Sequence, residues 1–229
     1  MVIGSGLLAN AFTPFFLESE DICIYTAGVS NSSCTDIREF AREHQRLENA
    51  LIQANHVDAF VYFGTCSIAD PESVSSPYVQ HKLKMEALVS AHPNSLILRL
   101  PQVAGKTSNP HTLLNYLYAR ISRSESFDLW GNASRNIIDV DDVALITKQI
   151  ISDNSYRRVI INIANKINYP LINIVNTFEK VIEKNAIYNI LERGCDYPID
   201  ISVIYPLLEK SRVIFDDDYL VKIIIKYFK

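Results

Sequence analysis

Several signals that often reveal what a protein does are missing from this 229-residue chain. Its four cysteines are scattered without a C-x-x-C pair and no secretory signal opens the chain, so we expect reduced thiols in a cytoplasmic protein. No apolar run reaches the length of a membrane span, so no membrane partner is expected. The net charge of −4 comes without a basic stripe, which argues against a nucleic-acid partner.

What is present is the composition of a folded globular protein, with 48% apolar and 21% charged residues. Predicted strands and helices alternate along the first part of the chain, which implies crossover connections and a mostly parallel sheet covered on both faces. After about residue 105 the regularity loosens, and no linker interrupts the chain. We therefore expect a doubly wound α/β fold in one compact unit. The predicted strands are 21–28, 58–65 and 95–101, and the predicted helices are 34–55, 77–91 and 111–121. The first of these helices has an apolar side made of Ile37, Phe40, Leu47, Leu51 and Ile52.

A glycine turn stands near the start of the chain, where Gly4–Ala9 fits the pattern G-x-G-x-x-A between a short strand and a helix. Such glycines allow a tight turn and close backbone approach, and the helix N-terminus can receive a pyrophosphate. The same pattern also fits a turn without a ligand. The next strand ends in Thr26-Ala27-Gly28, without the acidic residue that usually binds the adenosine ribose, so adenosine recognition stays open.

A second pattern places Tyr78 four residues before Lys82, about one helical turn apart. Ser76 can cap this helix, with Pro77 at its first position. Thr65 ends the preceding strand, so its hydroxyl can meet the phenol and the ammonium at the ligand-binding edge of the sheet. A nearby ammonium favours phenolate, so we expect a pKa of Tyr78 below its usual value of about 10. The alternative is an exposed Tyr and Lys on an ordinary helix.

Six segments, in consistent order, resemble the motifs of one family. The chain resembles the extended short-chain dehydrogenase/reductases, the group of NAD-dependent nucleotide-sugar epimerases, dehydratases and 4-keto reductases, as a shortened and atypical member. The resemblance implies a Rossmann-like core at 1–105, a partly substrate-binding region at 106–229, and NAD or NADP as cofactor. The segments are GSGLLA (4–9), ICIYTAGVSNS (22–32), FVYFGTCSI (60–68), SPYVQHKLKMEALV (76–89), LRLPQVAG (98–105) and FDLWGNASRNIIDVDDVALI (127–146).

The resemblance also implies roles for single residues. Tyr78 would be the catalytic acid/base, and Lys82 would orient the nicotinamide ribose while lowering the pKa of Tyr78. Thr65 would hydrogen-bond the substrate oxygen. The cofactor would contact Gly4, Gly6, Leu7, Leu8, Ala27 and Gly28, besides Tyr78 and Lys82.

Three further positions resemble substrate-binding residues of the family. Gln102 stands at the asparagine of the R-x-x-N-V-Y-G segment. Arg135 matches an arginine that often faces the nucleotide diphosphate, or it is a solvated arginine. His111 either faces the substrate or lies in water at a helix start. The DVDD run at 139–142 looks like a metal cluster, but we expect helix capping near Val143 and no metal.

The chain also departs from the family pattern. The segment between the glycine turn and the Ala27–Gly28 strand is short, so the second and third strands of the family sheet would be absent. Ile3 stands where the family has its first glycine. Cofactor affinity would then be poor, or the adenosine would be held in an unusual way.

The residues after Thr65 limit which of the family's reactions this chain is expected to catalyse. Family dehydratases place Asp-Glu there, whereas this chain has Cys66-Ser67, which argues against dehydration. A Thr-plus-Cys arrangement with a distant His resembles the epimerase–reductases that finish deoxysugars, although Cys66 also fits a small core thiol. We therefore predict reduction of a keto group on a nucleotide sugar, in deoxysugar or surface-polysaccharide precursor synthesis. Epimerization is the nearest alternative.

A non-enzymatic function also stays open, in which the shortened chain is a non-catalytic sugar-nucleotide-binding or scaffold subunit. The family resemblance further implies a homodimer, formed by the helices at about 36–54 and 77–91 as a four-helix bundle. Its apolar contact would use Phe40 and Leu47 from the first helix with Met85 and Leu88 from the second.

Overall fold

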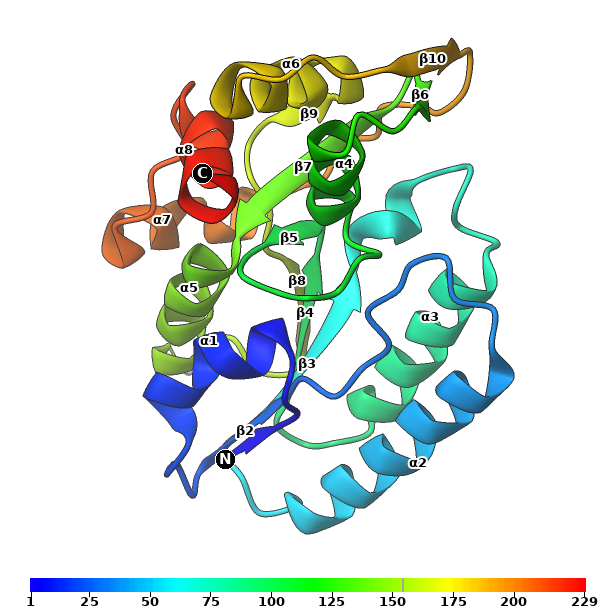
Figure 1. Cartoon of the computed structure of the whole chain (residues 1–229). Helices are drawn as coiled ribbons and strands as arrows, with labels where there is room; N and C mark the ends of the chain where they lie inside the picture. The colour runs from blue at the N-terminus through cyan, green and yellow to red at the C-terminus, as the bar shows by residue number, and fades with distance from the viewer. Residues whose placement is uncertain (154) are drawn as a thin grey trace.

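The computed structural model describes residues 1–153 and 155–229, and its central element is a five-stranded parallel sheet (Figure 1). All four strand pairings of this sheet are parallel, as expected for strands joined by helical crossovers. Its strands, in spatial order, are β1 (Val2–Ile3), β2 (Ile22–Tyr25), β3 (Ala59–Thr65), β4 (Ser95–Leu100) and β8 (Val159–Asn162).

Helices cover both faces of the sheet, which confirms the doubly wound α/β prediction. In Figure 1, α1 (Leu7–Phe16) and α5 (Val140–Ser152) lie on one side, and α2 (Ile37–Gln53) and α3 (Pro77–Ser90) lie on the other. Strand residues alternate between two buried clusters, because successive side chains of a strand point to opposite faces. Ile24 packs toward α1 and α5, for example, whereas its neighbour Tyr25 packs toward α2 and α3.

The sheet stops at β1, as the short segment after the glycine turn predicts. Within the described part of the chain, β1 is an edge strand that pairs with β2 alone, with Val2 opposite Ile24 and Ile3 opposite Tyr25. β2 leads directly into the Ala27–Gly28 loop. Among the described residues, the second and third strands of the family sheet therefore have no counterpart, as predicted.

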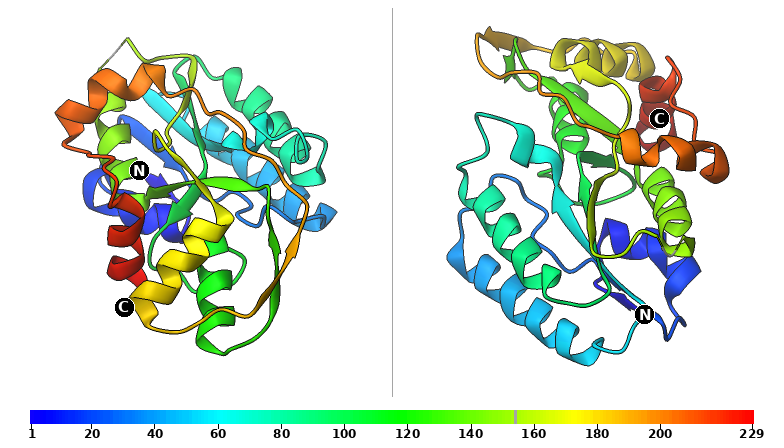
Figure 2. Two further views of the ribbon diagram at one scale, coloured as in Figure 1. Left: turned by 90° about the horizontal axis from the view of Figure 1, so that it is seen from above. Right: turned by 180° about the vertical axis from the view of Figure 1, so that it is seen from behind.

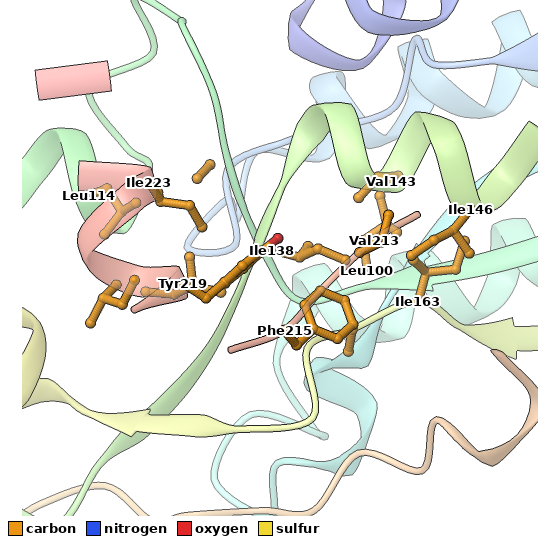
Figure 3. Packing of buried hydrophobic residues seen from close by; sticks show 14 of the residues in the cluster. Leu100, Leu114, Ile138, Val143, Ile146, Ile163, Val213, Phe215, Tyr219 and Ile223 are labelled. Atoms are coloured by element: carbon orange, nitrogen blue, oxygen red, sulfur yellow. The ribbon is translucent and has the colours of Figure 1, made fainter. Parts of the chain in front are cut away.

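The remaining elements form a second layer above the carboxyl ends of the sheet strands (Figures 1 and 2). Their buried hydrophobic residues and those of one face of the sheet form a single cluster, whose members lie between Phe12 and Ile224 in the sequence. Figure 3 shows part of it, where Val143 of α5 lies near Val213 and Ile146 of α5 lies near Ile163. These elements are β5 (Gln102–Ala104), α4 (Leu113–Ser122), β6 (Phe127–Trp130), β7 (Ser134–Asp139), β9 (Asn168–Pro170), α6 (Leu171–Ile182), β10 (Tyr188–Leu191), α7 (Tyr205–Ser211) and α8 (Tyr219–Phe228).

The buried face of α2 differs from the predicted one. Ile37 and Ile52 were expected among the apolar residues of one side, but they are 78% and 72% exposed. The buried stripe consists of Glu43, Leu47 and Ala50. A carboxylate thus occupies an interior position of the helix, where an apolar residue is usual.

Two residues assigned to the dimer contact lie in the core instead. Leu47 and Met85 are buried between the helices and the sheet, so neither is available for a contact with a second chain. Phe40 and Leu88 are only partly buried. The predicted apolar surface for a four-helix bundle is therefore wrong in half of its residues.

All four cysteines are free thiols. Among the helices that the structure describes, none is long and apolar enough to cross a membrane.

Candidate active site

A cavity of about 420 Å³ lies at the carboxyl ends of the sheet strands, where open α/β sheets bind their ligands. Its size is within the usual range of ligand pockets. Its walls come from the turns after β1, β2, β3 and β4 and from α2 and α3. All of the predicted catalytic and cofactor-binding residues line it.

The glycine turn forms one wall of this cavity and fits a pyrophosphate. A side chain at Gly6 would meet no atom within 4 Å, so the space above this residue is open. Gly6 also begins α1 without a side-chain cap. An uncapped helix N-terminus offers free N–H groups and a partial positive charge to an anion.

Two other glycines are required by close contacts. Gly4 has a φ of 134°, and a Cβ there would lie 2.2 Å from the Thr26 hydroxyl oxygen. A Cβ on Gly28 would lie 2.6 Å from Lys82 Nζ. The Ala27–Gly28 loop therefore passes directly over the predicted catalytic lysine, as a loop along a bound dinucleotide would.

The three predicted catalytic residues come together as expected. Thr65 is the last residue of β3, and Tyr78 and Lys82 lie in the first two turns of α3. The helix begins as predicted, with Pro77 at its first position and the Ser76 hydroxyl accepting a hydrogen bond from Val79 N at 3.3 Å. All three side chains are buried and border the cavity.

The predicted direction of the Tyr78 pKa is wrong for this structure. Burial raises the pKa of Tyr78 above its usual value, and Glu43 adds to that increase. Lys82 and a hydrogen bond from Thr65 act in the opposite direction but do not outweigh burial. The phenol is therefore protonated at neutral pH, which suits a proton donor.

A buried carboxylate that the sequence analysis missed organises this end of the cavity. Glu43 of α2 is 1% exposed. Its Oε1 accepts hydrogen bonds from the Tyr62 hydroxyl at 2.8 Å and from Lys82 Nζ at 3.1 Å. Its Oε2 accepts from Val29 N at 2.6 Å and contacts His81 Nε2 at 3.0 Å. Four polar groups thus converge on one carboxylate.

These partners keep Glu43 ionised. Burial alone would raise its pKa, but Lys82, His81, Val29 N–H and Tyr62 together lower the pKa to about 2. Glu43 thus places a fixed negative charge beside the Lys82 side chain. The only sequence signal was a glutamate in phase with the apolar stripe of α2, three residues after Phe40 and four before Leu47.

The ammonium of Lys82 is held by protein groups on three sides. Besides Glu43, it contacts the Tyr62 hydroxyl at 3.2 Å and the Phe63 carbonyl oxygen at 3.5 Å. The Phe63 contact is at the limit of hydrogen-bond distance. That weakest contact is the one Lys82 can most readily exchange for a ligand hydroxyl.

The three predicted substrate-binding residues do not all reach the cavity. Gln102 of β5 and His111 line it, whereas Arg135 of β7 does not. The Arg135 guanidinium donates to the neighbouring Ser134 carbonyl oxygen at 2.7 Å.

Cys66 is buried outside the cavity wall, and burial raises the pKa of its thiol to about 12, which matches a core thiol.

The DVDD run caps a helix. Asp139 precedes α5 and accepts a hydrogen bond from Asp141 N at 2.9 Å. Its carboxylate also binds Lys226 and Tyr227, and Asp142 accepts from Tyr219. Within residues 1–153 and 155–229, no group of three or more His, Cys, Asp or Glu side chains is arranged to hold a metal.

Comparisons with known proteins identify the family and the fold. Residues 9–164 match the model of the NAD dependent epimerase/dehydratase family. No curated protein sequence matches the chain.

Solved structures share the fold. UDP-glucuronic acid 4-epimerase from Bacillus cereus has a TM-score of 0.72 at 22% identity, covering 93% of this chain and 77% of that one. An epimerase from Methanothermobacter thermautotrophicus has a TM-score of 0.75 at 14% identity, covering 99% and 77%. RMD from Pseudomonas aeruginosa, complexed with NADPH, has a TM-score of 0.67 at 15% identity, covering 97% and 86%. Because the family match spans more than half of the chain, the chain belongs to the NAD dependent epimerase/dehydratase family.

Proposed function

We propose that the chain uses NADH or NADPH to reduce a keto group on a nucleotide sugar, as a step toward a deoxysugar or a surface-polysaccharide precursor. The observation that carries this proposal is the meeting of Thr65, Tyr78 and Lys82 at one end of a cavity whose other wall is the glycine turn. Several structural neighbours are nucleotide-sugar enzymes, including a UDP-N-acetylglucosamine 4-epimerase from Methanobrevibacter ruminantium in complex with UDP-N-acetylmuramic acid. Their likeness supports the substrate class.

The chemistry divides between the dinucleotide and the protein. When bound, the dinucleotide supplies a hydride to the keto carbon. The Tyr78 phenol gives its proton to the ketone oxygen, which becomes a hydroxyl. Thr65, whose side chain borders the same cavity as Tyr78, holds that oxygen near the phenol. The Lys82 ammonium, held in place by Glu43, stabilises the phenolate left on Tyr78 until solvent returns a proton.

Two features favour net reduction over the alternatives within the family. No aspartate or glutamate is among the described residues that line the cavity, which leaves a dehydratase without its usual acids. The sheet ends at β1, so one side of the adenosine site is open. A reductase must release the oxidised dinucleotide after every turnover, and an open site permits this. An epimerase restores its dinucleotide within each turnover and has no such need, so epimerization is the second candidate.

The test is to mix the purified chain with reduced dinucleotide and a 4-keto nucleotide sugar, and to follow the absorbance of the reduced nicotinamide together with the sugar products. A ketoreductase consumes one dinucleotide for each hydroxyl formed. An epimerase interconverts two nucleotide sugars with no net absorbance change. A scaffold subunit binds the nucleotide sugar and converts none, which would refute both catalytic proposals.

We also propose that the protein acts in the cytoplasm, where free thiols persist, and that it forms a homodimer. Because Leu47 and Met85 are buried, the contact would use the outer faces of α2 and α3. Ile37 and Ile52 are exposed on α2. Light scattering at micromolar concentration tests this, and a monomer mass for the wild type would refute it.

A further inference from the structure

The cavity collects positive charge in a protein whose net charge is −4. Its lining includes the side chains of Lys82 and two arginines of α2, Arg42 and Arg46. No described acidic residue lines it, and Glu43, which lies behind Gly28, is already paired with Lys82. The Arg42 and Arg46 charges are thus left without an acidic counterpart inside the cavity.

Both arginines line the cavity from α2. In the proposed function, the substrate lies beside Tyr78, Gln102 and His111, and the pyrophosphate lies at the glycine turn. The adenosine half must then extend past the ends of β1 and β2. Arg46 is close enough to Tyr25, the last residue of β2, for its charge to act on that phenol. Arg42 lies one helical turn before it, on the same face of α2.

Both guanidiniums are available to an anion. Arg46 is exposed and makes no ion pair with any described residue. Arg42 pairs with Glu39 on the same helix, where both side chains are largely in solvent. An exposed pair of this kind is worth little and exchanges readily for a better partner.

This arrangement is the reverse of what an NAD site requires. An NAD site usually places a carboxylate on the 2′-hydroxyl of the adenosine ribose, whereas an NADP site places an arginine near the 2′-phosphate. Arginine pairs with phosphate through two parallel hydrogen bonds, which gives both energy and geometry. We propose that Arg42 and Arg46 bind the 2′-phosphate, so that the chain uses NADP(H) in preference to NAD(H). This inference rests on the dinucleotide site of the proposed function.

The adenosine end also explains why a phosphate contact would matter here. With β1 at the edge of the sheet, no further strand of the described chain encloses the adenine or offers groups to the ribose hydroxyls. Binding free energy at this end must therefore come from α2 and from the Thr26–Gly28 loop. A doubly charged phosphate provides a strong contact to α2 without any enclosing strand.

The experiment titrates the full-length wild type with NADPH and with NADH by nicotinamide fluorescence, and repeats both titrations with Arg42→Gln, Arg46→Gln and the double variant. Arg38→Gln is the matched control, because Arg38 lies on the same helix but pairs with Asp36 outside the cavity. We expect the wild type to bind NADPH about 10- to 100-fold more tightly than NADH. The double variant should lose most of that difference by weakening NADPH alone, while Arg38→Gln changes neither affinity. Adenosine 2′,5′-bisphosphate should compete with NADPH for the wild type but not for the double variant.

Four outcomes would overturn the inference. Equal affinities for the two dinucleotides in the wild type would show that the arginines do not select the 2′-phosphate. A double variant that weakens nucleotide-sugar binding and leaves NADPH unchanged would assign them to the substrate diphosphate. If NADH is bound and consumed and the variants are neutral, this inference fails while the proposed function stands. If the chain binds neither dinucleotide, both this inference and the proposed function fail.

Discussion

At the Tyr78 end of the cavity, the ammonium of Lys82 is 4% exposed and is held by Glu43, Tyr62 and the Phe63 carbonyl. On the α2 side of the cavity, the guanidinium of Arg46 is exposed, makes no ion pair with a described residue, and lies near Tyr25 of β2. The first charge is fixed before any ligand arrives, whereas the second gains a fixed partner only from a ligand. Under the proposed function, the shortened fold keeps a rigid catalytic end, and its cofactor end binds the dinucleotide mainly through charge.

The largest expected effect comes from the phenol at the rigid end. In Tyr78→Phe, one oxygen is lost and the ring remains, so turnover of a 4-keto nucleotide sugar should fall by about 10²- to 10⁴-fold. Binding of NADPH should change little, because Arg42 and Arg46 are untouched. The measurement is nicotinamide absorbance during turnover, with the exposed Tyr205→Phe as the matched control. Unchanged turnover would remove Tyr78 from the chemistry.

Next in size is the effect of removing the buried carboxylate. Glu43→Gln keeps the side-chain shape but leaves Lys82 buried without its counter-ion, so the free energy of unfolding should fall by about 3–5 kcal/mol. Denaturant unfolding measures this loss. A change below about 1 kcal/mol would mean that Lys82 does not depend on Glu43, and that the two ends of the cavity differ less than the structure indicates.

The same carboxylate predicts a pH dependence of stability. The pKa of Glu43 is lowered from 4.5 to about 2 in the folded chain. Its contribution to stability is therefore complete above about pH 4.5 and is lost as the pH falls toward 2, because the unfolded chain binds a proton there first. The contribution is about 3 kcal/mol. The free energies of unfolding of the wild type and Glu43→Gln should converge as the pH falls through this interval. A difference that stays constant would contradict the lowered pKa of Glu43.

The smallest effect is expected at the exposed end. Glu39→Gln breaks the surface pair with Arg42, and the free energy of unfolding should change by less than about 1 kcal/mol. The variant is also the matched control for Glu43→Gln, since both glutamates lie on α2. By freeing Arg42, it should leave NADPH binding unchanged or slightly tighter. A loss comparable to that of Glu43→Gln would erase the distinction between a buried and an exposed charge pair.

Features with a local cause were predicted correctly. Ser76 and Pro77 start α3 because capping and proline placement depend on a few neighbouring residues. Thr65 ends β3 because an apolar run ends there. The missing strands followed from a count of residues between the glycine turn and the next strand. Predictions about burial fared worse, since Ile37 and Ile52 face solvent and Leu47 and Met85 face the core.

The sequence by itself determined the order of the elements, the short sheet, and the placement of Thr65, Tyr78 and Lys82 at one edge, because each depends on local pattern and spacing. Only the tertiary structure decided the electrostatics. Glu43 meets Val29, Tyr62, His81 and Lys82, which lie 14 to 39 residues away along the chain. The pKa of Tyr78 is raised because burial, which depends on the whole fold, outweighs the lysine one turn away.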